Sequence, residues 1–79
     1  MSEVFEKVRD ALALQLHIGE DMITPDSLIA EDLGADSLDR IELIMSIEEE
    51  YELTVDEKDV QHFKTVGDVV GYIEKKTLR

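Results

Sequence analysis

The 79-residue sequence predicts an all-α fold, a small antiparallel four-helix bundle with three long helices and one short helix. Three segments repeat apolar residues at spacings of three and four, which is the period of a helix with one buried face. Residues 20–35, between the first two of these segments, show no period and are expected to form a long ordered loop. A chain of this length has room for one domain, so residues 1–79 are expected to fold as a single unit.

The first helix is expected over about residues 2–16, with Gly19 as its C-terminal cap. Its apolar stripe consists of Val4, Phe5, Val8, Ala11, Leu12 and Leu16. In the loop that follows, the sequence Thr24-Pro25-Asp26-Ser27 is typical of a turn. The residues expected to anchor this loop on the core are Ile18, Met22, Ile23, Leu28 and Leu33.

The second helix is expected from Asp36 to about Tyr51. Asp36 suits the N-cap, and Asp39 lies three residues later, in the relation of a capping box. This helix has two apolar faces. The face expected to lie on the core comprises Leu43, Ile44, Ile47 and Tyr51. The opposite face comprises Leu38, Ile41 and Met45, surrounded by Glu42, Glu48, Glu49 and Glu52.

The second apolar face is a candidate docking surface, because a bundle helix needs only one buried face. The alternative is that this face packs against the long loop. After the second helix, a short helix around residues 57–63 is expected to be anchored by Val60 and Phe63. The last helix is expected to start at Thr65, with Asp68 completing another capping box. Its apolar stripe consists of Val66, Val69, Val70 and Ile73.

The chain is strongly acidic, with 20 acidic and 8 basic residues and a formal charge of -12. This charge argues against nucleic acid and anionic membrane surfaces as partners, because both favour Lys and Arg. Residues 31–59 account for -10 of the total, so the negative field is concentrated on the second helix and the linker after it. The pattern favours basic partners that dock there.

The sequence contains no cysteine, so it encodes neither a disulfide nor a thiol nucleophile. No signal or transit peptide is evident, and no apolar run approaches the roughly 20 residues of a membrane span. We therefore expect a cytoplasmic monomer with no membrane insertion.

Ser37 follows Gly34-Ala35-Asp36 and is expected at the first position of the second helix. A role as a hydrolase nucleophile is disfavoured, because no Gly-x-Ser-x-Gly motif surrounds it and nothing marks His17 or His62 as its base. A helix N-terminus does favour a phosphate through its free N–H groups and its dipole. A phosphorylated or phosphodiester-linked Ser37 is therefore electrostatically acceptable.

The stretch EDLGADSLD at residues 31–39, followed by Glu42-Leu43 and by EEEY at residues 48–51, closely resembles the acyl carrier proteins of dissociated (type II) fatty acid synthesis. The resemblance covers essentially the whole chain, including the helix start TVGD at residues 65–68. It implies that Ser37 carries a 4'-phosphopantetheine arm, which a phosphopantetheinyl transferase attaches from coenzyme A. Acyl groups would be held on the thiol of this arm as thioesters, so we expect a non-catalytic carrier rather than an enzyme.

The resemblance also implies a partner surface and an acyl cavity. The implied partners are ketoacyl synthases, reductases, dehydratases and transacylases with basic patches. The residues that would meet them are Asp36, Leu38, Asp39, Ile41, Glu42, Met45, Glu48 and Glu49. The candidate cavity residues, which would be ordinary core when no acyl group is attached, are Leu43, Ile47, Val66 and Val70.

Two segments depart from the family pattern. Arg40 stands where the family usually has a small or neutral residue, on the core side of the second helix. An ion pair with Asp36, four residues earlier, is expected to offset the unfavourable position of a cation near a helix N-terminus. Two roles for Arg40 stay open: a peripheral residue with its stem on the edge of the core, or a residue that alters partner choice. The segment DVQHFK at residues 59–64 is less acidic and bulkier than is usual there, which bears on acyl-chain preference.

Other functions remain open from the sequence. Polyketide, lipid A and peptidyl carriers share the serine motif, and an unmodified acidic adaptor would use the same docking surface. No EF-hand spacing is present, and we expect no dedicated metal site. Weak cation binding along residues 48–50 remains an alternative for that acidic run.

Overall fold

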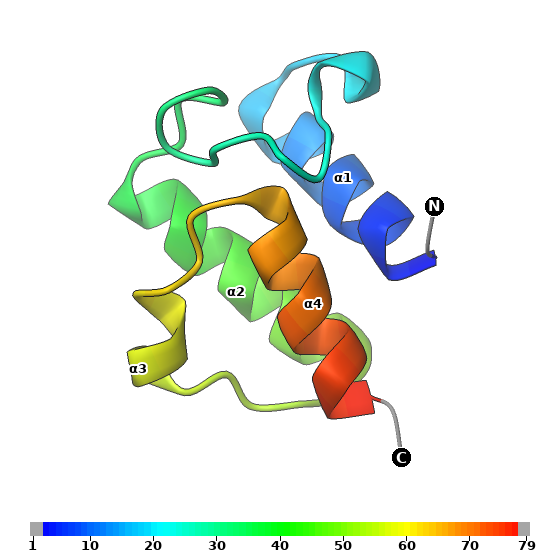
Figure 1. Cartoon of the computed structure of the whole chain (residues 1–79), viewed down its shortest axis with the longest axis vertical. Coiled ribbons are helices and arrows are strands. Elements are labelled where there is room, and N and C mark those ends of the chain that lie inside the picture. The colour runs from blue at the N-terminus through cyan, green and yellow to red at the C-terminus, as the bar shows by residue number, and fades with distance from the viewer. Residues whose placement is uncertain (1–2, 78–79) are drawn as a thin grey trace.

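The computed structural model describes residues 3–77, and in that range every regular element is a helix (Figure 1). The elements are α1 (Glu3–Leu16), the short 3-10 helix η1 (Glu20–Met22), α2 (Ser37–Tyr51), α3 (Glu57–Val60) and α4 (Val66–Thr77). Three helices are long and α3 is short, so the expected small all-α bundle is confirmed. The described part of the chain includes no helix long and apolar enough to cross a membrane.

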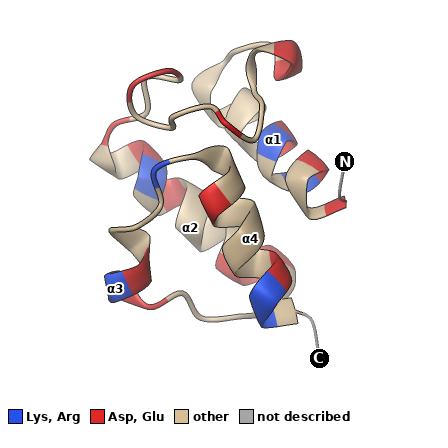
Figure 2. Cartoon of the chain, in the orientation of Figure 1, with Lys and Arg blue, Asp and Glu red and all other residues tan. Residues whose placement is uncertain are grey.

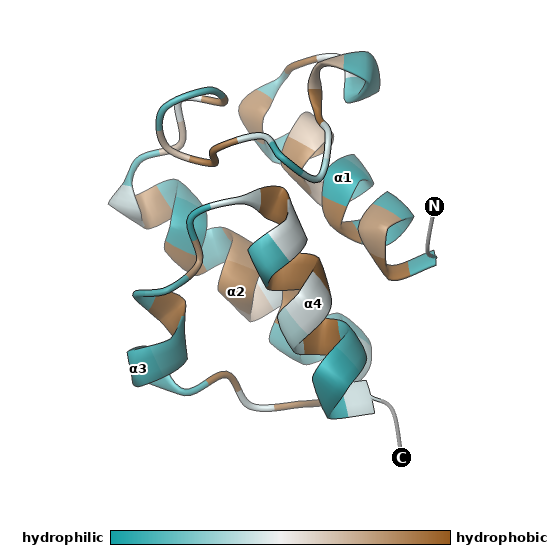
Figure 3. Cartoon of the chain, viewed as in Figure 1, coloured by the Kyte–Doolittle hydropathy of each residue, from teal (hydrophilic) through white to brown (hydrophobic). Residues whose placement is uncertain are grey.

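The core lies between α1, α2 and α4. The hydrophobic positions of these helices are brown in Figure 3. Every residue of the expected α4 stripe is buried. The expected faces of α1 and α2 also lie on the core, although Val4, Ala11, Leu16 and Tyr51 are only partly buried. Ala13, outside the expected stripe, is buried as well. The buried residues of these three helices are Phe5, Val8, Leu12, Ala13, Leu43, Ile44, Ile47, Val66, Val69, Val70 and Ile73. The three apolar stripes therefore account for most of the core.

The cap at the end of α1 differs from the expectation. His17, not Gly19, adopts the left-handed conformation, with φ of 59°. The N–H of Ile18 donates to the carbonyl of Ala13 at 3.1 Å, which is the hydrogen bond of a Schellman cap. Ile18 packs against the core, so the chain has to turn at the residue before it. Gly19 instead precedes η1 with φ of -71°.

The loop between α1 and α2 is ordered by contacts with the start of α4. Ile29 N–H donates to the carbonyl of Lys64 at 2.9 Å, and Gly67 N–H donates to the carbonyl of Pro25 at 2.8 Å. A Cβ atom at Gly67 would lie 2.9 Å from that carbonyl oxygen, so this close approach requires glycine. Met22 was expected to anchor the loop but is 65% exposed, whereas Ile29, which was not singled out, is buried.

α4 begins with the expected capping box. The N–H of Asp68 donates to Thr65 Oγ1 at 3.0 Å, and the N–H of Thr65 donates to Asp68 Oδ2 at 3.0 Å. A third N–H, from Lys64, reaches the same carboxylate oxygen at 3.1 Å. These hydrogen bonds, led by the one from the Thr65 backbone, hold the pKa of Asp68 below its usual value of 3.8.

Replacing Asp68 by alanine is expected to lower the free energy of unfolding by about 1 kcal/mol at pH 7. The carboxylate has a lower pKa in the folded than in the unfolded chain. Its contribution is therefore complete above about pH 4 and is lost as the pH falls through the folded-state pKa. Urea unfolding of parent and variant at several pH values checks this. A difference that stays constant down to pH 2.5, roughly one unit below the usual aspartate pKa, would contradict it.

Candidate functional site

Ser37 is the first residue of α2 and is exposed. The segment before it is held by hydrogen bonds from Gly34 N–H to the carbonyl of Ala30 and from Ala35 N–H to the carbonyl of Ile29, both 3.1 Å long. Ala35 is buried, and Gly34 has φ of 73°, a backbone conformation that favours glycine. The backbone on the N-terminal side of Ser37 is therefore fixed while its side chain stays at the surface.

Asp36 caps α2 in the expected capping box. Its Oδ1 accepts from the N–H of Asp39 at 2.9 Å, and its own N–H donates to Asp39 Oδ2 at 3.1 Å. Capping is thus performed by Asp36, so the neighbouring hydroxyl of Ser37 has no capping role.

A surface hollow of about 350 Å³ lies beside Ser37. Its lining residues are Ser37, Arg40, Ile41, Val60 and Gln61. This lining includes no histidine or carboxylate to act as a general base, so the hollow gives no support to a hydrolase role.

Leu38, Ile41 and Met45 form an exposed apolar stripe along α2. Their exposed fractions are 62%, 53% and 61%, so the alternative that this face packs against the long loop is wrong. Exposed acidic residues flank the stripe, including Glu42 and Glu49, and acidic residues mark α2 from its start to its end (Figure 2). The surface combines apolar contact area with a negative field.

Glu48 has a different environment from the other acids of this helix. Its carboxylate accepts from the N–H of Val55 at 2.9 Å, and its carbonyl accepts from the N–H groups of Glu52 and Leu53. Glu48 is half-buried, and its side chain holds the linker after α2. Its sequence position among other glutamates gave no indication of this contact.

Arg40 does not form the expected ion pair with Asp36. No such pair is found in the described residues; instead Arg40 Nη2 donates to the carbonyls of Val60 and Phe63 at 3.0 and 3.1 Å. The core-side position of Arg40 directs its guanidinium toward α3, away from the solvent side of the helix. The carbonyls near the end of α3 thus accept hydrogen bonds from a cationic side chain.

The phosphopantetheine attachment site family model matches residues 6–73 of this chain. An acyl carrier protein of Clostridium perfringens is 50% identical over 74 residues, which cover 94% of this chain and 97% of the relative. An acyl carrier protein of Thermotoga maritima is 43% identical over 74 residues, which cover 94% and 91%. The solved structure of the acyl carrier protein from Enterococcus faecalis superposes with a TM-score of 0.82 at 31% identity, covering 95% of each chain.

The chain belongs to the acyl carrier protein family.

Family membership confirms three expectations. The chain is a carrier of acyl groups rather than an enzyme, and its prosthetic group is phosphopantetheine. This role implies interaction with a phosphopantetheinyl transferase and with fatty acid synthesis enzymes in general. Phosphopantetheine supplies the thiol to which acyl groups are attached. The chain itself has no cysteine that could supply one.

The surroundings of Ser37 fit an acyl carrier's prosthetic group. The hollow beside the hydroxyl combines apolar walls from Ile41 and Val60 with polar groups from Arg40 and Gln61. A pantetheine arm has both amide groups and methylene segments, so mixed walls of this kind suit it. The N-terminus of α2 also favours the negative charge of a phosphodiester.

The four candidate cavity residues of the carrier lie in different places. Leu43 lines a cavity of about 10 Å³ between α2 and α3. Ile47 lines a separate hollow of about 350 Å³ between α1 and α2. Val66 and Val70 are buried in the core and line neither of these two spaces. The structure therefore brings only Leu43 to the cavity under Arg40.

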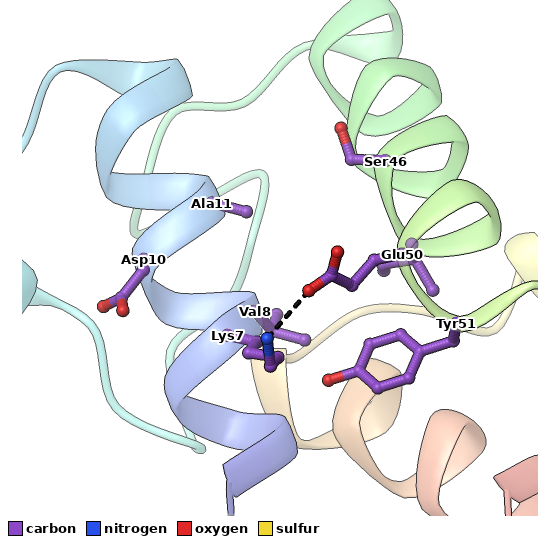
Figure 4. A pocket seen from close by; sticks show the side chains of 8 residues that line it. Lys7, Val8, Asp10, Ala11, Ser46, Glu50 and Tyr51 are labelled. Carbon is purple, nitrogen blue, oxygen red and sulfur yellow. Dashed lines mark hydrogen bonds and ion pairs between the residues drawn. The ribbon is translucent and has the colours of Figure 1, made fainter.

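The hollow between α1 and α2 is bridged by an ion pair (Figure 4). Lys7 Nζ lies 2.7 Å from Glu50 Oε1, and this hydrogen bond raises the pKa of Lys7. Burial raises the pKa of Tyr51, whose hydroxyl is buried without a hydrogen-bond partner. The described residues contain no group of three or more His, Cys, Asp or Glu that could hold a metal ion.

Proposed function

We propose that Ser37 is the phosphopantetheine attachment residue and that the chain delivers acyl groups to the separate enzymes of type II fatty acid synthesis. The observation that carries the proposal is the exposed Ser37 at the first position of α2, next to a cap supplied by Asp36. The hydroxyl is accessible to a transferase, and the phosphodiester formed there would meet the positive end of the helix dipole.

The partner face of this carrier is the α2 surface around the exposed stripe. It comprises Asp36, Leu38, Asp39, Ile41, Glu42, Met45, Glu48 and Glu49. The apolar stripe provides the desolvated centre of an interface, and the acidic rim attracts basic patches on ketoacyl synthases, reductases, dehydratases and transacylases. Because Glu48 already holds the Val55 backbone, we expect it to contribute less to binding than Glu42 or Glu49.

Intact-mass measurement after incubation with coenzyme A and a phosphopantetheinyl transferase tests the attachment. We expect one addition of phosphopantetheine, located at Ser37 by mass mapping of peptides. An unchanged mass, or an addition elsewhere, would refute the proposal. The pathway is tested by the groups attached in protein from its native cell. A series of fatty acyl groups supports fatty acid synthesis, whereas polyketide or aminoacyl groups assign the chain to another pathway.

Charge reversal on the partner face is expected to weaken the transferase complex. Glu42→Lys should lower the association rate by about tenfold at low salt, because the rim steers basic partners, and the loss should shrink as salt is added. Glu6→Lys changes the net charge equally but lies on α1, so it serves as the control. Stopped-flow binding at several salt concentrations measures both variants. Equal losses for the two would contradict a role for the α2 face.

A further inference from the structure

Arg40 lies where three hollows meet. Its side chain lines the surface hollow beside Ser37, a second surface hollow that reaches Lys64, and the small cavity between α2 and α3. Arg40 is the residue that these three spaces have in common. A chain tethered at Ser37 would therefore meet Arg40 on the way to the cavity.

The guanidinium of Arg40 ties α3 to α2. It donates hydrogen bonds of 3.0 and 3.1 Å to the carbonyls of Val60 and Phe63, on either side of the turn that ends α3. α3 has four residues, none of them buried. A short element with so little buried surface opens easily. The two hydrogen bonds of Arg40 add to the packing of Val60 and of the buried Phe63 in holding α3 on the core.

The cavity beneath α3 is too small for an acyl chain. Its volume of about 10 Å³ holds about one water-sized sphere. Val60 at the end of α3 and Phe63 just after it line the cavity together with Leu43 and Ile44 of α2, Ile29 of the loop and Val69 of α4. Movement of Val60 and Phe63 away from α2 would enlarge the cavity enough to admit an acyl chain, and that movement breaks the hydrogen bonds made by Arg40.

Arg40 has other acceptors within reach once it leaves α3. Asp36 and Ser37 lie four and three residues before it, on the same side of the helix. A phosphodiester on Ser37 would accept charge-assisted hydrogen bonds from the guanidinium. Modification of Ser37 would thus offset part of the free energy that is needed to release α3.

We propose that Arg40 is a gate residue that positions α3 and controls the passage of an acyl chain from Ser37 into the cavity between α2 and α3. The closed position is the one in the structure, with Arg40 on the carbonyls of Val60 and Phe63. In the open position Arg40 turns to the anionic groups at the start of α2. This inference rests on the proposed attachment at Ser37 and deepens it, because it names a residue that decides where the cargo lies.

The test uses an octanoyl chain labelled with carbon-13 at its terminal methyl and loaded through coenzyme A. It is attached to the parent, Arg40→Met, Arg40→Lys and the control Lys58→Met, which removes an exposed cation from α3. Broadening of the methyl signal by a soluble paramagnetic agent measures how much of the chain is exposed. Arg40→Met should raise the ratio of buried to exposed chain about tenfold, equivalent to about 1.4 kcal/mol. Arg40→Lys keeps one donor and should give an intermediate value, and Lys58→Met should match the parent.

Amide hydrogen exchange gives a second measurement. The Phe63 amide donates to the carbonyl of Val60 in the closed form. Loading the parent with octanoyl phosphopantetheine should therefore speed hydrogen exchange at this amide. In Arg40→Met, exchange at the same amide should already be fast before loading. If a folded Arg40→Met variant shows the same ratio of buried to exposed chain as the parent, the gate proposal is wrong, while the attachment at Ser37 is unaffected. If Arg40→Met does not fold, the same comparison with Arg40→Lys decides. Failure of the parent to accept any group at Ser37 overturns the proposed function and the gate together.

Discussion

A chain with Ser37 replaced by alanine is expected to gain no mass when it is incubated with coenzyme A and a phosphopantetheinyl transferase. Attachment needs a hydroxyl to form the phosphodiester, and alanine removes it. The loss is expected to be complete. The described lining of the hollow beside Ser37 offers no second hydroxyl that could replace it.

The fold of the Ser37→Ala variant should be unchanged, which separates this result from unfolding. Ser37 is exposed, and Asp36 caps α2, so the substitution removes no capping hydrogen bond and should change stability by less than about 0.5 kcal/mol. Ser46→Ala is the matched control, because Ser46 is an exposed serine on the same helix. It should be modified like the parent. Modification of Ser37→Ala, or loss of modification in both variants, would refute the assignment.

Replacing Leu12 by alanine is expected to lower the free energy of unfolding by about 2–5 kcal/mol. Leu12 is 1% exposed, in the middle of the α1 stripe that packs on α2 and α4. Removing its side chain loses buried apolar area and leaves a cavity. A 79-residue domain has a total stability of roughly 4–12 kcal/mol, so the variant will lie close to its unfolding transition.

Leu14→Ala is the matched control for this prediction. Leu14 lies two residues further along α1 and is 80% exposed, so the same chemical change should cost less than about 0.5 kcal/mol. Urea unfolding followed by circular dichroism measures both variants. The melting temperature of Leu12→Ala should fall by roughly 10 °C or more. Similar losses for the two variants would mean that α1 is not packed as the structure describes.

Much of the fold followed from local patterns. The helix start at Ser37 and the two capping boxes were readable because the groups that form each box lie within three residues of one another. The core stripes were readable because helical period alone decides which side chains share a face. The apolar stripe of Leu38, Ile41 and Met45 was predicted in the same way. Its exposure, however, depended on whether the long loop packs against it.

The loop itself was less predictable. Its order depends on hydrogen bonds with the start of α4, about 40 residues away along the chain. Met22 was expected to be an anchor and Ile29 was not, yet Met22 is exposed and Ile29 is buried. The cap at His17 was missed for a related reason, since the inward packing of Ile18 decides where α1 must turn.

Arg40 shows most clearly how a contact predicted from the local sequence differs from the contact made in the folded chain. Its sequence neighbours predicted an ion pair with Asp36, which is the contact available within one helix. In the folded chain, α3 offers two carbonyls to the same guanidinium, and a well-placed pair of charge-assisted hydrogen bonds is favoured over a solvent-exposed ion pair.

The sequence by itself determined the helices, the acidic face of α2 and the candidate serine, because periodicity, charge and capping act over a few residues. The tertiary structure alone decided which acidic side chains remain available, as with Glu48, and which hollow lies beside Ser37. Those features depend on contacts between segments far apart in the chain. Such contacts are set by how the helices pack, which no local pattern encodes.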